Sequence, residues 1–326
     1  MVTLKDIAAA CGTSIATVSY VLSGRGEERR ISAAMQERVV KVARELNYDL
    51  TAKARKNRRP SIAVYWPQRQ FDSVLPSFIA GMNTALGVTP IQTDVTIRPY
   101  DPGRLSEQTS LWLPGRSSAS VIVSASNEDL ETLKQHQTTY PAVLLNRTVA
   151  GYPSVTIDEV EAVQMAAEYA AVQAGGRITL VLPDKWLLGA QYRSLSVQET
   201  LRRCGIQPQA CYSCGLAIDD GYSLGQKLLL EGAASGVFLC LQDTVALGLS
   251  LAFRDGGLVM GRDAEIITMS NSYQSANTRL YESLTVVDLR QVEVSICGIN
   301  LAIEMATHAG IEPKQTVLHP VLVPHR

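Results

Sequence analysis

Residues Leu4–Leu22 read LKDIAAACGTSIATVSYVL. This stretch contains two short runs with apolar residues at helical spacing, and Gly12 separates them. Glycine readily takes the positive φ that ends a helix and turns the chain. The stretch therefore predicts two helices packed across a tight turn.

Side chains suited to helix capping mark where these helices begin. Thr3, with Asp6 three residues later, has the spacing of a capping box. Ser14 is a good N-cap for the second helix, and Ser32 for a third helix that reaches about Leu46. The third helix is expected to bury an apolar stripe made of Met35, Val39, Val42 and Leu46.

The second helix has one face for the core and one for a partner. Val18, Val21 and Leu22 are expected to point inward. The outward residues are short hydroxyl and apolar side chains with one aromatic ring, namely Ile15, Ala16, Thr17, Ser19 and Tyr20. Such side chains suit base edges and thymine methyl groups, while amides at a helix start favour phosphate. The pattern predicts a helix-turn-helix that enters a DNA major groove, although a plain three-helix bundle shares part of it.

A longer match supports the DNA-binding interpretation. VTLKDIAAACGTSIATVSYVLSG, followed by RISAAMQERVVKVARELNY, resembles the head of the LacI/GalR family of bacterial transcriptional regulators. That family shows V-T-x-x-D-I-A, then G-x-S-x-x-T-V-S, and ends in E-L-N-Y. The resemblance implies that Ile15, Ala16 and Tyr20 choose bases, and that Ser14, Thr17 and Ser19 touch the DNA backbone. Tyr20 stands where many relatives have Arg, so a different half-site is expected.

The head contributes further DNA contacts outside its second helix. We assign Thr3 to this set, together with Arg25 and Arg29 of the loop GRGEERR, which is longer than in many relatives. These arginines suit phosphate, although solvated loop charges would have the same sequence.

The linker departs from the family pattern. Relatives continue with P-N-x-x-A-R-x-L, a hinge helix whose leucine wedges into the minor groove. Here Leu50 replaces the proline and Asn57 replaces the leucine, while Ala54-Arg55 is kept. Its DNA-contacting residues are expected to be Lys53, Arg55, Lys56 and Asn57. The segment is strongly cationic, so it predicts phosphate binding on DNA and a disordered basic linker off DNA.

From residue 61 onward, short β-branched runs alternate with amphipathic stretches. Strands are expected at 62–66, 95–98, 120–124, 142–146, 178–182, 236–241, 265–269, 284–287 and 316–323. Helices are expected at 77–86, 128–137, 159–174, 190–203, 220–231, 244–254 and 292–309. Apolar strands alternating with helices predict parallel sheets covered on both faces, so the body is α/β.

The domain organisation follows from these elements. We expect a helix-turn-helix domain at 1–48, a basic hinge at 49–60, and an effector-binding and dimerisation body at 61–326. The body is expected to form two doubly wound lobes, at about 61–158 plus 288–315 and about 159–287 plus 316–326. It also resembles the family's effector domain, which is like periplasmic sugar-binding proteins.

The effector residues are carried over from the family one position at a time. Arg193 matches an arginine that relatives use on ligand hydroxyls or carboxylates, although a surface charge would look the same. Asn146 and Ser270 stand where Asp is usual, Gln242 where Asn is usual, and Phe71 would supply a wall. Carboxylates bind sugar hydroxyls strongly, so losing two of them beside Arg193 favours an anionic effector such as a sugar phosphate.

Composition excludes several other functions. Residues 1–60 hold 12 basic and 6 acidic residues, while the remainder holds 18 and 25 of the totals of 30 and 31, as expected when only the head meets phosphate. The chain has no apolar run long enough to span a bilayer and no signal pattern, so we expect a cytoplasmic protein. Six cysteines and four histidines show no ligand spacing apart from one Cys211-x-x-Cys214, so neither metal nor cofactor is implied.

The sequence therefore predicts a DNA-binding transcriptional regulator, most simply a repressor. It would bind a palindromic double-stranded operator as a homodimer and respond to a sugar or sugar phosphate in a cleft between the lobes. One alternative is a regulator of the same fold that is effector-independent or controlled by a protein partner. An enzyme with a DNA-binding head ranks last, because no catalytic motif is present and Asp219-Asp220 suit helix capping.

Overall fold

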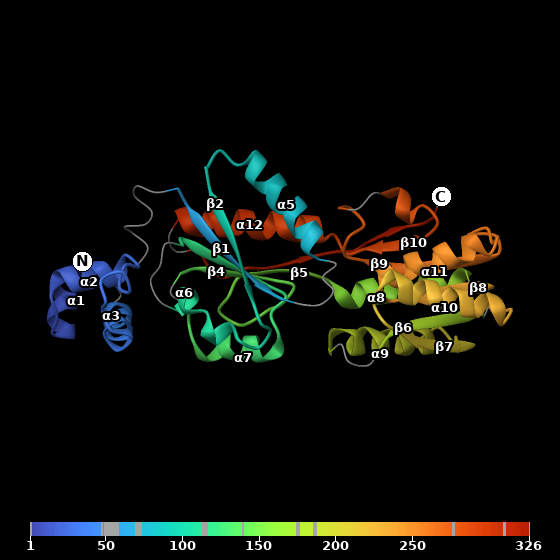
Figure 1. Ribbon diagram of the computed structural model, residues 1–326, viewed down its shortest axis with the longest axis horizontal. Helices are drawn as coiled ribbons and strands as arrows, with labels where there is room; N and C mark the ends of the chain where they lie inside the picture. The colour runs from blue at the N-terminus through green and yellow to red at the C-terminus, as the bar shows by residue number, and fades with distance from the viewer. Residues whose placement is uncertain are drawn as a thin grey trace. The chain divides into compact units, whose positions relative to one another are not determined.

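The computed structural model describes residues 2–46, 48, 59–68, 74–112, 117–138, 140–173, 177–184, 188–275, 278–308 and 311–325. The chain divides into two compact units. Unit 1 comprises Met1–Arg69, Met82–Thr156 and Ile296–Thr316, and unit 2 comprises Gln70–Gly81, Ile157–Ser295 and Val317–Arg326. Figure 1 shows their helices and strands. No described helix is both long enough and apolar enough to cross a bilayer.

The first helices of unit 1 form the expected helix-turn-helix head. They are α1 (Leu4–Cys11), α2 (Ile15–Leu22) and α3 (Ala33–Glu45). Their shared core contains fully buried apolar side chains from all three helices, among them Ile7, Val18, Val21 and Val39. The apolar spacing seen in the sequence therefore corresponds to a packed core.

The strands of unit 1 form a six-stranded sheet in the order β11-β5-β4-β3-β1-β2 within the described residues. They are β1 (Ser61–Pro67), β2 (Asp94–Tyr100), β3 (Ala119–Val123), β4 (Ala142–Leu145), β5 (Ser154–Ile157) and β11 (Gln315–Leu318). Strand β1 pairs in parallel with β2 on one side and β3 on the other. The strand order reverses between β1 and β3. Open α/β sheets bind ligands at such a reversal.

Helices cover both faces of this sheet. The helices are α5 (Leu75–Val88), α6 (Thr109–Trp112), α7 (Asn127–Gln135) and α12 (Gln291–Thr307), with a short 3-10 turn, η1 (Leu105–Glu107). Figure 1 shows α5 and α12 on the face opposite α6 and α7. Helix α12 approaches β4 so closely that a Cβ added to Gly298 would clash with Leu145.

Unit 2 contains a second six-stranded sheet in the order β12-β10-β9-β8-β6-β7 within the described residues. Its strands are β6 (Ile178–Pro183), β7 (Ala210–Cys214), β8 (Gly236–Cys240), β9 (Ala264–Ser270), β10 (Thr285–Asp288) and β12 (Val321–Val323). Neighbouring strands of this order pair in parallel except β10 with β12, which are antiparallel. The order reverses between β6 and β8.

The helices of unit 2 pack on opposite faces of its sheet. They are α8 (Glu159–Gln173), α9 (Leu188–Arg203), α10 (Ile218–Leu230) and α11 (Asp243–Asp255), with the 3-10 turn η2 (Thr278–Tyr281). Leu239 joins a buried cluster with α8 and α9, while its neighbour Phe238 joins one with α10 and α11. Alternate residues of a strand point to opposite faces, so both faces of these strands had to be apolar.

The sequence predictions of the body were right in class and wrong at particular elements. Strands β5 and β7 were missed, and the single strand expected at 316–323 is two strands. Of these two, β11 lies in the sheet of unit 1 and β12 in that of unit 2. Pro320 stands between them and lacks an amide hydrogen for a continuous ladder. Asp220 caps α10 as expected, since its carboxylate accepts from the Ala217 amide at 2.8 Å.

Candidate functional site

The start of α1 is a reciprocal capping box. The Asp6 amide donates to Thr3 Oγ1 at 3.4 Å, and the Thr3 amide donates to Asp6 Oδ2 at 2.8 Å. The Thr3 hydroxyl also donates to that carboxylate, and these bonds lower the pKa of Asp6. Gly12 ends the helix with φ of 61°, as its position predicted.

The start of α2 presents polar and small apolar groups to the outside. Ser14 Oγ accepts from the Thr17 amide at 3.0 Å and lies 2.9 Å from the Thr17 hydroxyl. Ile15 is 48% exposed, and Ala16 is also exposed. An exposed helix start with unsatisfied amides attracts anions, so this end of α2 suits a phosphate-lined groove.

The third helix packs its predicted stripe against the core of the head, but the centre of its buried face is shifted from that stripe. Ser32 caps it as expected, by accepting from the Met35 amide at 3.4 Å. The residues that α3 buries are Gln36, Val39, Val40 and Ala43, whereas Met35, Val42 and Leu46 are half-buried. Gln36 is buried although it is polar, and its Nε2 donates to the carbonyl of Ile31, five residues earlier, at 2.8 Å.

The second half of α2 carries Tyr20 under two arginines of the following loop. The guanidinium carbon of Arg29 lies 4.7 Å from the centroid of the Tyr20 ring, and that of Arg25 lies 5.3 Å from it. Arg25 Nε also donates to Ser23 Oγ at 3.3 Å. The remaining outward residue, Ser19, is half-buried. The structure therefore brings the loop arginines together with a residue of the predicted base-reading set.

Several predicted residues lie outside the described part of the chain. The linker residues Lys53, Arg55, Lys56 and Asn57 belong to this group, and so does Phe71 of the effector set. Their roles stay predictions.

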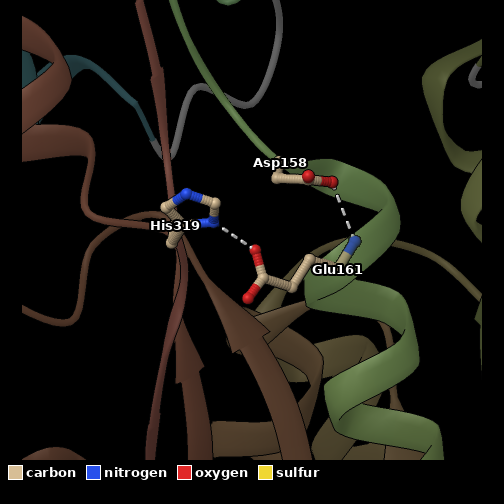
Figure 2. Close-up of side chains that lie close together, drawn as sticks. All are labelled: Asp158, Glu161 and His319. Atoms are coloured by element: carbon tan, nitrogen blue, oxygen red, sulfur yellow. Dashed lines mark hydrogen bonds and ion pairs between the residues drawn. The ribbon is translucent and has the colours of Figure 1, made fainter.

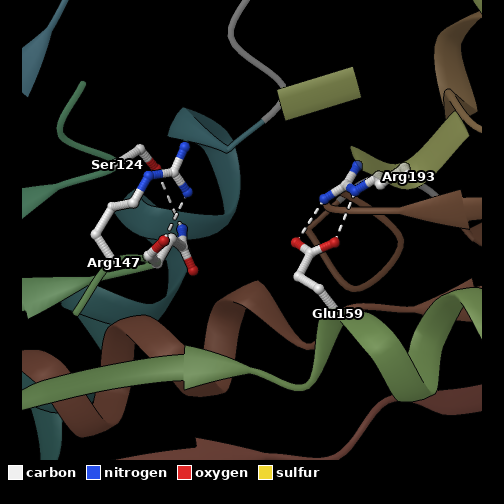
Figure 3. Close-up of polar contacts among 5 residues, drawn as sticks. Ser124, Arg147, Glu159 and Arg193 are labelled. Atoms are coloured by element: carbon white, nitrogen blue, oxygen red, sulfur yellow. Dashed lines mark hydrogen bonds and ion pairs between the residues drawn. The ribbon is translucent and has the colours of Figure 1, made fainter. Parts of the chain in front are cut away.

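In unit 2, Arg193 of α9 is paired with Glu159, the first residue of α8. Arg193 Nε donates to Glu159 Oε2 at 2.7 Å, and Nη2 donates to Oε1 at 2.6 Å, a bidentate pair that Figure 3 shows. Their side chains are 22% and 46% exposed. Burial on its own would lower the pKa of Arg193, but the Glu159 carboxylate and then the more distant Asp243 raise it. Arg193 is therefore a charge that is already compensated.

The carboxyl ends of β8 and β9 meet at a buried carboxylate. Asp243, 1% exposed, accepts from the hydroxyls of Ser270 at 2.6 Å, Ser272 at 2.8 Å and Tyr281 at 3.4 Å. It also accepts from the Thr244 amide at 2.9 Å, at the start of α11. Burial and the charge of Asp243 raise the pKa of Tyr281. Sequence reasoning named Ser270 but missed Asp243 as its partner.

Two further polar side chains lie near strand ends of unit 2: the predicted residue Gln242 and the unpredicted residue Asp288. Gln242 lies two residues after the end of β8, at the N-cap of α11, and is half-buried. Asp288 ends β10 beside Ser270 in register, and burial raises its pKa to about 6 although its carboxylate accepts from the Arg290 amide. Arg290 has a φ of 49°, a backbone conformation that non-glycine residues rarely adopt. The backbone at Arg290 therefore turns the chain sharply after β10. Nothing in the sequence indicated this turn.

In unit 1, the carboxyl ends of β3 and β4 carry another polar group (Figure 3). Asn146 Nδ2 donates to Ser124 Oγ at 3.3 Å, and both residues have positive φ, 60° and 46°. Arg147 Nε donates to the Ala125 carbonyl at 3.2 Å. Strained backbone at strand ends is often found where a fold holds a ligand. Asn146, which the sequence predicted as an effector residue, thus lies at a strand end, and its partner Ser124 was not predicted.

Among the described residues, one cluster has ligand atoms close enough to hold a cation. Asp158, Glu161 and His319 place three such atoms within 4.8 Å of one another (Figure 2). His319 Nδ1 lies 2.6 Å from Glu161 Oε2, and Asp158 Oδ1 accepts from the Glu161 amide at 2.9 Å. The hydrogen bond and charge of Glu161 raise the pKa of His319. An ion pair beside a helix cap accounts for every contact.

The C-x-x-C pair does not form a site. Cys211 and Cys214 lie three residues apart on β7, so they point to opposite faces of the strand. Burial raises the pKa of the Cys214 thiol to about 11, which keeps it protonated and unreactive.

Comparison with known proteins matches this architecture to one family. The family model "Bacterial regulatory proteins, lacI family" matches residues 3–49, which cover the capped helices of the head. The chain belongs to the LacI family. The LacI-family chain is 28% identical to the ribose operon repressor of Bacillus subtilis (strain 168) over 280 residues, which cover 84% of this chain and 83% of that protein. It is 25% identical to the transcriptional repressor CytR of Escherichia coli (strain K12) over 281 residues, 82% and 80% of the two chains.

Solved structures extend the likeness to the whole fold. A LacI-family regulator from Clostridium acetobutylicum superposes with a TM-score of 0.71 at 22% identity, covering 82% of this chain and all of that one. The Lac repressor dimer bound to operator and the anti-inducer ONPF superposes with a TM-score of 0.65 at 19% identity, covering 99% and 97%. The fold class is confirmed: a helix-turn-helix head joined to two α/β lobes of the periplasmic-binding-protein type. The LacI-family chain is a DNA-binding transcription regulator and not an enzyme.

Proposed function

We propose that this LacI-family chain represses transcription as a homodimer bound to a palindromic DNA operator. The observation that carries the proposal is the start of α2, where Ser14 caps the helix and leaves Ile15 and Ala16 exposed within a head that matches the family. Relatives support it, since they include operon repressors and a repressor dimer on its operator. As a bacterial regulator it would act in the cytoplasm, where the chromosome is.

The domain division belongs to the same proposal. The head at 1–48 would read DNA, the basic hinge at 49–60 would join it to the body, and the lobes would bind the effector. Each unit separately carries polar side chains at the carboxyl ends of its strands, which is where α/β sheets bind ligands.

The effector is proposed to be a small carbohydrate. The sequence favoured an anionic compound, on the premise that Arg193 offers a free positive charge. The bidentate contact with Glu159 removes that premise, and a guanidinium and a carboxylate side by side offer donors and acceptors to neutral hydroxyls. A neutral sugar is therefore the first candidate, and a sugar phosphate is the second. A solved structure of similar fold, the transcriptional regulator CelR in complex with cellobiose, supports a sugar as the first candidate.

DNA binding is tested by selecting duplexes from a random-sequence pool with the full-length chain. We expect a palindromic consensus, protected in footprinting at two half-sites, and a complex with the mass of a dimer. Ala16→Glu places a negative charge on the exposed start of α2 and should abolish selection. Ala9→Glu makes the same change at an exposed site of α1 and should leave it intact. Failure of the wild-type chain to enrich any sequence would refute the proposal.

The effector is tested by a thermal-shift screen of neutral sugars and their phosphates. A ligand that binds only the folded chain raises the melting temperature, and the rise grows with the logarithm of ligand concentration above the Kd. A shift that also changes operator affinity identifies the effector class. A screen without any shift would favour the regulator that is effector-independent or controlled by a protein partner.

A further inference from the structure

The Tyr20 ring supports two loop arginines, an arrangement that family resemblance alone did not predict. The guanidinium groups of Arg25 and Arg29 both lie within cation–π distance of the ring centroid, at 5.3 and 4.7 Å. Tyr20 itself is half-buried at the end of α2, so its ring is held by the helix. A face occupied by guanidinium groups cannot also lie flat against a base.

The loop that carries these arginines is fixed by its own hydrogen bonds. The Arg25 amide donates to the Tyr20 carbonyl at 2.9 Å, which closes the end of α2 directly onto the ring-bearing residue. The Arg29 amide donates to the Arg25 carbonyl at 3.1 Å, so the two arginines belong to one turn. Gly24, with φ of 70°, allows the chain to reverse between helix and loop.

A buried polar side chain holds this loop against the rest of the head. Gly26 is buried against the Gln36 side chain so closely that an added Cβ would clash with it. Gln36 in turn donates to the Ile31 carbonyl, and the Ile31 amide donates to the Gly26 carbonyl at 2.9 Å. The loop is thus anchored at both of its ends, and the arginines are presented from a fixed backbone.

The charges of both arginines stay available to a ligand. Within the described residues, neither Arg25 nor Arg29 forms a salt bridge, and both are exposed. A guanidinium stacked by its face on a ring still has its N–H donors at its edge. Those donors match a planar pair of acceptors, which a DNA phosphate and the guanine edge both offer.

We propose that Tyr20 is a positioning residue, whose ring holds Arg25 and Arg29 so that their N–H edges contact the operator beside the recognition helix. The inference rests on the proposed DNA-binding function. It replaces the prediction that Tyr20 chooses bases itself, and it gives the long loop GRGEERR a part in operator recognition.

The test uses the duplex that the full-length wild-type chain selects, with affinity measured for matched variants. Tyr20→Phe keeps the ring, so affinity and base preference should stay within about twofold of wild type. Tyr20→Leu and Arg29→Ala should each weaken binding. Combining them should cost about two- to fivefold less than the product of the single losses, as expected for an exposed cation–π contact. Arg38→Ala removes the same charge from an exposed site on α3 and should show no such coupling with Tyr20→Leu.

Two further measurements distinguish the acceptors. If Arg29 contacts phosphate, its removal weakens all sequences alike and lowers the salt slope by about 0.9. If it contacts guanine, its removal relaxes the preference at one operator position. Losses from Tyr20→Phe as large as those from Tyr20→Leu would overturn the proposal, as would fully multiplicative losses. A wild-type chain that selects no duplex would instead refute DNA binding itself.

Discussion

Asp243→Asn keeps the shape of a buried side chain and removes its charge. The carboxylate accepts from three hydroxyls, those of Ser270, Ser272 and Tyr281, and from one amide. Hydrogen bonds to a charged acceptor contribute about 1.5–3 kcal/mol each, against about 1 kcal/mol for neutral ones. In Asp243→Asn, each of the three shorter bonds loses the extra strength that a charged acceptor provides. A buried amide costs less to desolvate than a carboxylate, which offsets part of this loss. The local free energy of unfolding should therefore fall by about 2–3 kcal/mol.

The matched control lies at the other end of the same helix. Asp255, the last residue of α11, is exposed and accepts from the Tyr222 hydroxyl at 2.9 Å. Asp255→Asn removes an identical charge, but in water and at the helix end where a negative charge is unfavourable. We expect its effect to stay within about 0.5 kcal/mol.

Hydrogen exchange resolved by peptide is the suitable assay, because it reports the opening of α11 and β8–β9 separately from the rest of the chain. A loss of about 2–3 kcal/mol corresponds to exchange that is about 30- to 140-fold faster in Asp243→Asn. Peptides of the unit 1 sheet should be unchanged. A change below about threefold, or an equal change in Asp255→Asn, would refute the assignment of Asp243 as the buried anchor of these strand ends.

Three further changes are predicted. Asn57→Leu restores the family's apolar wedge, so it should tighten operator binding or change the preference at the central base pairs. Affinity is measured on the selected duplex and on duplexes altered at the central base pairs, and unchanged affinities on all of them would contradict the prediction. Because burial raises the pKa of Asp288 to about 6, the folded chain binds more protons than the unfolded chain between about pH 4 and pH 6. The stabilising effect of Asp288→Asn in denaturant titrations should therefore grow with pH across that window and then level off, whereas a pH-independent difference argues against it. Glu159→Gln frees the positive charge of Arg193, so the thermal shift produced by a sugar phosphate should increase relative to that of its parent sugar. An unchanged ratio of the two thermal shifts would show that Glu159 does not set effector charge.

Capping signals were predictable from sequence because each involves residues only a few positions apart. Thr3 with Asp6, Ser14 with Thr17 and Ser32 with Met35 all form the expected bonds. The buried face of α3 was not predictable in the same way. Gln36 is polar, and it is buried because the loop at Gly26 packs on it, a contact between separate segments.

The two missed strands differ from the central strands in different ways. Strand β7 lies at the edge of its sheet, with alternately half-buried and exposed residues, so it lacks the continuous apolar run of the central strands. Strand β5 has only 4 residues, SVTI, in which polar side chains alternate with apolar ones. Patterns of hydrophobicity identify strands buried on both faces, and they lose edge and short strands.

The ligand chemistry of unit 2 shows most clearly what local sequence leaves open. Among the predicted effector residues, carboxylates were lost at Asn146 of unit 1 and at Ser270 of unit 2, which made the predicted site look cationic. The fold returns carboxylates from other positions: Glu159 binds Arg193, and Asp243 binds the hydroxyl of Ser270 itself. These pairs are separated by 34 and 27 residues in the chain, so only tertiary packing reveals them.

Charge at these strand ends then bears on the effector. Above the Asp288 pKa of about 6, this group has three carboxylates, on Glu159, Asp243 and Asp288, and two guanidinium groups, on Arg193 and Arg290. It therefore carries no net positive charge. A phosphate would have to separate Arg193 from its carboxylate and leave Glu159 unpaired, whereas the hydroxyls of a neutral sugar can bond to both members of the pair as it stands. If these residues form the proposed effector site, the loss of one negative charge would favour a phosphate. We therefore propose Glu159, a residue without any signal in the sequence, as the position most able to change effector preference.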